Sequence, residues 1–110
     1  MHILIEPPII LDESGDTGVF DSIESAELDM EPIDVEDNRY VAFDSVGRLL
    51  RILPTTPRVT LEAAEEFPNH AEQVRALLIK FLGDCGSTDP NLPTLTLEQL
   101  VQRSLPFKCR

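Results

Sequence analysis

Apolar residues concentrate in two short segments near the middle of the chain, at 40–43 and 49–53. Both segments are rich in strand-forming residues, and residues 44–48 between them include Asp, Ser and Gly, which favour turns. The pattern predicts a β-hairpin in which Gly47 takes the left-handed position of the loop.

Side chains alternate between the two faces of a strand, so the hairpin sequence also predicts which residues share a face. We expect Val41 and Phe43 on one face, with Leu50 and Ile52 as their cross-strand partners. The residues expected on the other face are Tyr40, Ala42 and Asp44.

Apolar spacing changes to a helical period on the N-terminal side of the hairpin. Asp21 is followed three residues later by Glu24, a capping-box pattern that predicts a helix over residues 22–30. The apolar residues expected to pack on the sheet are Ile23, Ala26 and Met30. The carboxylates expected to point into solvent are Glu24, Glu27 and Glu31. Pro32 is expected to end this helix, and residues 31–38 to form an exposed acidic loop.

A longer helix is predicted in the second half of the chain, from about residue 70 to residue 82. Asn69 and Glu72 have capping-box spacing, and Gly83 is expected to end the helix. Its apolar stripe consists of Val74, Leu77, Leu78, Phe81 and Leu82. Because burying one such side chain contributes about 1.5–3 kcal/mol before entropy, we expect this helix to be the main cover of the sheet.

Four shorter segments complete the first two thirds of the chain. Residues 2–5 and 9–11 are apolar and predict extended segments, and residues 12–18 predict a polar loop. Residues 58–62 favour a third strand beside the hairpin, with a short helix capped by Thr60 as the alternative.

The elements together predict the fold class. Thr96 followed by Gln99 adds a last short helix. We therefore expect an α+β fold in which an antiparallel sheet, with the hairpin 39–53 at its centre, packs against two to three helices. At 110 residues, the chain is expected to form a single domain, 1–110, with a helical C-terminal half.

Charge is distributed unevenly along the chain, whose net charge is −11. Residues 1–38 hold twelve of the twenty carboxylates and no Lys or Arg, whereas residues 39–110 hold the other eight and all nine basic residues. A strong field of one sign argues against nucleic acid or an anionic membrane as a partner and favours a basic protein surface or a cation. The alternative is an acidic surface that only keeps the protein soluble.

A calcium-binding loop is the first chemical possibility that the acidic residues raise. Asp12, Ser14 and Asp16 alternate as in an EF-hand. The sixth position of that loop is Thr17 where Gly is required, and the twelfth is Ile23 where a bidentate Glu is required. The sequence therefore argues against specific calcium binding.

Other candidates for catalysis or metal binding are few and far apart. His2 and His70 are the only imidazoles, and no spacing links them to Cys85 or Cys109. We expect no enzymatic activity, no metal site and no cofactor. Both cysteines are expected to be free thiols, with a disulfide between them as the alternative. Neither a signal peptide nor a membrane span is predicted, which favours a cytoplasmic protein.

The candidate partner-binding residues therefore lie in the acidic part of the chain and at the start of the hairpin. They are Asp21, Glu24, Glu27, Asp29, Glu31, Asp34, Glu36, Asp37 and Tyr40. If the acidic face is only solvated, the alternative interface is the outer face of the hairpin around Tyr40, Leu49 and Arg51.

Three runs of sequence carry a resemblance to a known class of proteins. The runs are VFDSIESAE at 19–27, EPIDV at 31–35 and YVAFDSVGRLL at 40–50. In these runs the chain resembles the small acidic immunity proteins of bacterial polymorphic and contact-dependent toxin systems, over roughly residues 19–83. The resemblance implies a cytosolic inhibitor that binds one toxin domain and blocks its active site or a neighbouring surface.

Two classes of function follow from the sequence. The first is an immunity protein whose acidic surface binds a basic toxin domain such as a nuclease, since nucleases must be basic to hold phosphates. The second is a non-catalytic acidic protein-interaction or small-ligand-binding module unrelated to toxins. A neighbouring gene for a secreted protein with a C-terminal toxin domain would favour the first.

Overall fold

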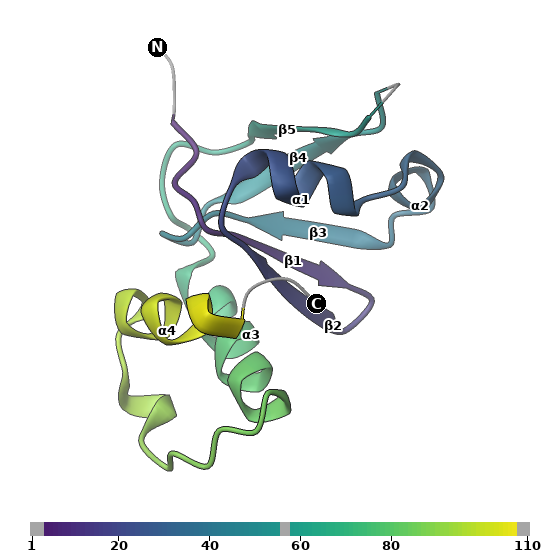
Figure 1. Ribbon diagram of the computed structural model, residues 1–110. Helices are drawn as coiled ribbons and strands as arrows, with labels where there is room; N and C mark the ends of the chain where they lie inside the picture. The colour runs from purple at the N-terminus through teal and green to yellow at the C-terminus, as the bar shows by residue number, and fades with distance from the viewer. Residues whose placement is uncertain (1–3, 56–57, 108–110) are drawn as a thin grey trace.

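The computed structural model describes residues 4–55 and 58–107. Its strands form one antiparallel sheet in the order β2-β1-β3-β4-β5, with helices on both faces (Figure 1). The predicted α+β fold is confirmed, and the predicted hairpin occupies the central strand and its neighbour. The elements run in the order β1 (Ile9–Glu13), β2 (Asp16–Phe20), α1 (Ile23–Asp29), α2 (Pro32–Glu36), β3 (Tyr40–Phe43), β4 (Leu49–Leu53), β5 (Thr60–Ala63), α3 (Ala71–Asp84), the short 3₁₀ helix η1 (Leu92–Thr94), α4 (Leu97–Ser104) and the 3₁₀ helix η2 (Leu105–Phe107).

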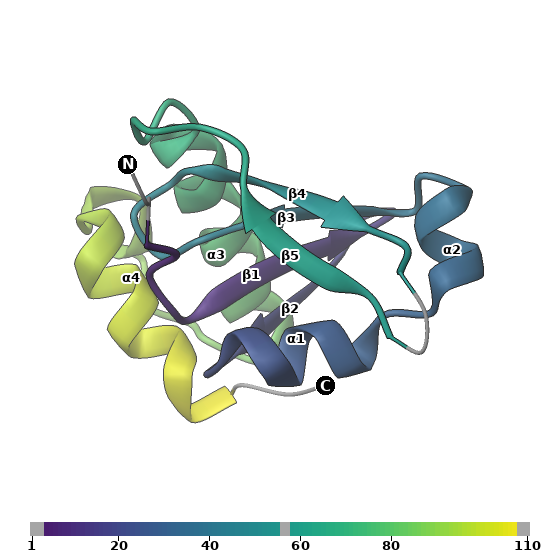
Figure 2. The same ribbon diagram turned by 90° about the horizontal axis from the view of Figure 1, so that it is seen from above.

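Each face of the sheet has its own apolar core. On one face Ile9 and Leu11 of β1 pack with Ala26 of α1, and on the other face Ile10 packs with residues of α3 and α4. Figures 1 and 2 show α1 and α3 on opposite sides of the strands. Because β1 is covered on both faces, its apolar residues are continuous instead of alternating with polar ones.

The predicted loop at 12–18 is wrong, because these residues form the tip of a β1–β2 hairpin. Ser14 and Gly15 have φ angles of +50° and +98°, and two positive φ values in a two-residue connection are typical of a type I′ turn. The Ser-Gly dipeptide at the turn was the sequence signal for this hairpin. The expected strand at 2–5 is also wrong for Leu4 and Ile5, which belong to no strand, while residues 1–3 lie outside the described residues.

The β3–β4 hairpin is confirmed, and Gly47 has the expected positive φ angle, +95°. Its predicted face assignment is wrong. Ala42 is opposite Leu50, and Phe43 is opposite Leu49, so Leu50 shares a face with Ala42 and not with Phe43. The loop length sets this register, and a register shift of one residue exchanges the faces of a whole strand.

The first helix is confirmed with a different cap. Ser22, not Asp21, is the N-cap residue, and its hydroxyl accepts a hydrogen bond from the backbone N–H of Ser25. The side chain of Ser25 in turn accepts a hydrogen bond from the backbone N–H of Ser22, which is the role predicted for Glu24. The helix consequently begins at Ile23, whose side chain packs against the sheet as expected.

The predicted acidic loop at 31–38 contains a helix, α2, and this is the helix that the sequence prediction missed. Pro32 is its first residue. Proline is well tolerated there, because its missing N–H would have no partner inside the helix and its fixed φ suits the first turn. Pro32 therefore separates two helices, where we had expected it to end one and lead into a loop.

The long helix α3 is confirmed, with Val74 and Leu78 fully buried against the sheet. Both of its predicted ends differ. His70 is the N-cap residue, without a side-chain cap, and Gly83 lies inside the helix. The chain turns away at Gly86, which has a φ of +98° and donates its N–H to the carbonyl of Gly83.

The last two predictions on secondary structure are confirmed. The segment that favoured a third meander strand forms β5, which pairs with β4 over Thr60–Ala63. Thr96 caps α4 through a capping box with Gln99. Helix α4 then packs on α3 and, through Leu100, joins the core on that face of the sheet.

Candidate functional site

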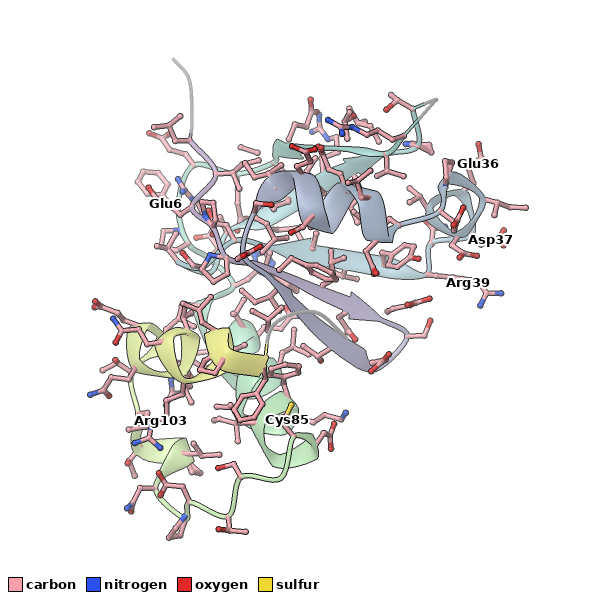
Figure 3. The ribbon with its side chains drawn as sticks, in the orientation of Figure 1. Glu6, Glu36, Asp37, Arg39, Cys85 and Arg103 are labelled. Carbon is pink, nitrogen blue, oxygen red and sulfur yellow. The ribbon has the colours of Figure 1, made fainter. Side chains whose placement is uncertain are left out.

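The predicted partner-binding residues gather on α1, α2 and the connections beside them. Residues 21–37, which we call the acidic segment, hold eight carboxylates. Those that lie exposed are Asp21, Glu24, Asp29, Glu31, Glu36 and Asp37, and Asp34 is half-buried. Figure 3 shows Glu36 and Asp37 at one end of the sheet, far from the α3–α4 side where Cys85 and Arg103 lie. The structure thus brings seven of the nine predicted residues to the surface.

Glu27 is a correction to the sequence prediction, because its side chain is buried rather than solvated. Its Oε2 accepts a hydrogen bond of 2.8 Å from the backbone N–H of Leu61 in β5. Its Oε1 lies 3.7 Å from an amino group of Arg58. Because β5 is the last strand of the sheet, Glu27 ties α1 to a sheet edge and is unavailable to a partner.

We expect Glu27→Ala to lower the free energy of unfolding by about 1–3 kcal/mol, because it leaves the Leu61 amide without its acceptor. Urea denaturation measures this loss. The matched control is Glu24→Ala, since Glu24 also faces Arg58, at 3.8 Å, but its side chain is exposed. An exposed ion pair is worth about 0–1 kcal/mol. Equal losses in the two variants would contradict the role assigned to Glu27.

Two arginines that lie outside the acidic segment in the sequence approach its carboxylates. Arg39 lies 3.5 Å from Asp34 and 4.0 Å from Asp37, and Arg58 reaches Glu24 and Glu27. Both arginines follow the acidic segment in the chain and return to it through the fold. They offset part of its charge, and the surface remains acidic because five of its carboxylates, Asp21, Asp29, Glu31, Glu36 and Asp37, are exposed in addition to Glu24.

Tyr40, the last predicted residue, is only 9% exposed and belongs to the core under α1. Burial raises the pKa of its hydroxyl, and the carboxylate of Glu13 raises it further. A hydrogen bond with the backbone of Glu31 acts in the opposite direction on the pKa, while Asp34 and Asp29 raise it. The Tyr40 hydroxyl thus lies in the field of the acidic segment.

The alternative interface around the hairpin does not form one surface. Tyr40 belongs to the core on the α1 face, whereas Leu49 packs against the core on the α3 face. Arg51 is exposed and pairs with Glu62 at 2.7 Å. Tyr40 and Leu49 therefore point to opposite faces of the sheet, although both line one hollow beside β3 and β4.

Two apolar side chains of the acidic segment were missed by the sequence prediction. Leu28 on α1 is 62% exposed, and Ile33 on α2 is 67% exposed. Leu28 lies off the buried stripe formed by Ile23, Ala26 and Met30, and this was the available sequence signal. Single exposed apolar residues are normal on protein surfaces, and these two offer apolar area to a partner that binds the acidic segment.

His70, one of the two imidazoles considered for catalysis, contacts a carboxylate that binds the backbone of the hairpin. The Nδ1 of His70 lies 2.8 Å from Oε1 of Glu65, and the same oxygen accepts a 2.7 Å hydrogen bond from the N–H of Leu49. That backbone hydrogen bond, followed by the contact with His70, holds the pKa of Glu65 below its usual value despite some burial. The cluster joins the β5–α3 connection to the hairpin.

Cys85 is a free, exposed thiol, and Cys109 lies outside the described residues. Within residues 4–55 and 58–107, no three His, Cys, Asp or Glu side chains converge closely enough to hold a metal ion. In the same ranges, no helix has the length and apolar character needed to cross a membrane.

Comparison with protein families, with curated proteins and with solved structures finds no match for this chain. The charge, exposure and geometry of the acidic segment are therefore the features that bear on the function of this protein.

Proposed function

We propose that this protein is an immunity-type inhibitor that binds and neutralises a basic bacterial toxin domain through its acidic segment. The observation that carries the proposal is the separation of charge. Residues 1–38 contain twelve carboxylates and no Lys or Arg, and eight of these carboxylates belong to the acidic segment. The exposed Leu28 and Ile33 add apolar contact area to the same two helices.

Electrostatics explains what such a surface contributes to inhibition. An acidic surface attracts a basic partner before contact and raises its association rate above the neutral value of about 10⁵–10⁶ M⁻¹s⁻¹. Nucleases are basic because they hold phosphates, so a nuclease-type toxin fits this surface. Binding alone is sufficient for inhibition, and the proposal includes no catalytic step. The cytoplasm, where such a toxin acts, is the proposed location.

The experiment is a charge reversal with a matched control. The test variant carries Glu24→Lys, Glu31→Lys and Glu36→Lys, and all three side chains are exposed in the acidic segment. Glu27 is left unchanged because it is buried. The control carries the same reversals at exposed sites in the helical half, at Glu66, Glu72 and Glu98. Both variants change the net charge equally, so any difference between them reports the location of the binding surface.

The partner in this test is a toxin domain found by sequencing the genes adjacent to the one for this protein, and stopped-flow mixing gives the association rate. We expect the test variant to associate more slowly by about tenfold or more at low salt, and the control to stay near the wild-type rate. The wild-type advantage should disappear as the Debye length falls from about 10 Å at 0.1 M salt to 3 Å at 1 M. Equal rates for the two variants would overturn the acidic surface as the binding site.

A second candidate function is a small-ligand-binding module. It is favoured by a hollow of about 290 Å³ between the hairpin loop and α4, lined by Val46, Leu97 and Val101 among others. Its volume is at the lower limit for ligand pockets, which usually measure about 300–1,000 Å³. If the adjacent gene encodes no toxin domain and the protein binds no neighbouring product, this candidate replaces the first.

A further inference from the structure

The two central strands of the sheet separate soon after their shared loop. β3 pairs with β1 over four residue pairs, and β4 pairs with β5 over four, but β3 and β4 pair only at Ala42–Leu50 and Phe43–Leu49. Continuing this register would place Tyr40 opposite Ile52, yet that pair is absent. Figure 1 shows β4 diverging from β3 towards the end of the sheet that carries α2.

The separation leaves a hollow of about 220 Å³. It is lined by Val35 and Asn38 from the α2 side and, from the two strands, by Tyr40, Val41, Leu49, Leu50 and Ile52. Because alternate residues of an antiparallel strand turn their N–H and C=O to the same neighbour, the backbone groups of Tyr40 and Ile52 face this opening. The hollow thus combines aliphatic side chains with polar groups, and Val41 at its surface is 39% exposed.

Carboxylates adjoin the α2 side of the hollow. Asp34 and Asp37 flank the lining residues of α2 in the sequence and share a single arginine, Arg39, at 3.5 and 4.0 Å. Figure 3 shows Asp37, Glu36 and Arg39 together at this end of the molecule. The pKa of Tyr40, raised first by burial and then by Glu13, with Asp34 contributing, indicates that this negative field extends into the lining.

The volume of the hollow and the negative charge beside it indicate which kind of group would bind there. A hollow of about 220 Å³ is below the usual 300–1,000 Å³ of small-molecule pockets, so a single long side chain suits it better than a complete ligand. Lys and Arg place an aliphatic stem on apolar surface and keep their charge at a polar end. We propose that this hollow receives one Lys or Arg side chain of the basic partner, an inference that rests on the proposed function.

The test uses n-butylammonium chloride as the probe, because it reproduces the stem and charge of a lysine side chain. Amide chemical shifts of ¹⁵N-labelled protein are followed during the titration. We expect saturable shifts at Val35, Asn38 and Ile52, and weaker binding by about tenfold for uncharged n-butanol. Equal binding of the two probes, or shifts spread over all exposed carboxylates, would overturn the proposal.

Two valine variants supply the structural control. Val41→Phe fills the hollow from an exposed strand position, where an aromatic residue suits the β conformation. Val46→Phe adds the same ring at the hairpin loop, where Val46 is 40% exposed and lines a different hollow. We expect Val41→Phe to weaken n-butylammonium binding by about tenfold and Val46→Phe to leave it unchanged. Unchanged binding in Val41→Phe would refute the site.

This test is separate from that of the proposed function, because it needs no protein partner. Failure of n-butylammonium to bind would remove the side-chain site while the charge-reversal result stands. Failure of the charge reversal would remove the acidic binding surface even if the hollow binds the probe.

Discussion

Replacing Asp44 by alanine is expected to lower the free energy of unfolding by about 3–5 kcal/mol, the usual cost of removing one partner of a buried ion pair. The Asp44 side chain is fully buried. Its Oδ2 accepts a 2.8 Å hydrogen bond from Nε of Arg48 and one of 3.3 Å from the N–H of Glu6. Its Oδ1 accepts the N–H groups of Arg48 and Val46 at 2.9 and 3.3 Å. The variant leaves all of these donors without their acceptor.

The control for Asp44 is an exposed ion pair of nearly the same length, between β4 and β5. Arg51 and Glu62 approach to 2.7 Å, but their side chains are 60% and 44% exposed. We expect Glu62→Ala to cost only about 0–1 kcal/mol. Urea denaturation of both variants makes the comparison, and a loss in Asp44→Ala no larger than that in Glu62→Ala would refute the role given to burial.

Gly47→Ala should be the second most damaging change, with a cost of about 2–5 kcal/mol from two causes that add. Gly47 has a φ of +95°, where an L residue loses about 1–2 kcal/mol. A Cβ at this position would also lie 2.4 Å from Cα of Ala71 at the start of α3, and such overpacking costs about 1–3 kcal/mol. The carbonyl of Gly47 accepts a 2.8 Å hydrogen bond from the N–H of His70. Because this bond holds the loop against the start of α3, the two backbones cannot move apart to relieve the clash without breaking it.

Gly15→Ala separates the two causes. Gly15 has nearly the same φ angle, +98°, but among the described residues no heavy atom beyond its two chain neighbours lies within 4 Å of the position of its Cβ. Only the backbone cost of about 1–2 kcal/mol is expected there. Thermal unfolding compares the loss of melting temperature in the two variants. Equal losses would show that Ala71 moves aside without a loss of stability.

The sequence predicted the elements whose signals are local. The apolar stripe of α3, the capping box at Thr96 and the loop position of Gly47 each depend on residues within a few positions of one another, and each is confirmed. The cap of α1 was predicted one residue too early, because Asp21 and Ser22 are both good N-cap residues and propensity alone does not choose between them.

Long-range features were not predictable from the same signals. Glu27 follows the spacing of a solvated face, and it is buried only because the edge strand β5 passes beside α1. The side on which Leu50 lies depends on the register set by the whole hairpin loop. The separation of β3 and β4, which creates the proposed side-chain site, is likewise a property of the assembled sheet and has no counterpart in the local sequence.

The bond between Glu27 and Leu61 also bears on how the protein meets other copies of itself. An uncovered edge strand is a template on which another chain can add a strand and start aggregation. At the outer edge of β5 the amide of Leu61 is already occupied by Glu27, and α1 lies beside the strand. Helix α1 therefore covers part of the outer edge of β5, and its exposed side carries the acidic surface. A partner that binds α1 must leave Glu27 in place, or the complex would gain an edge open to strand addition.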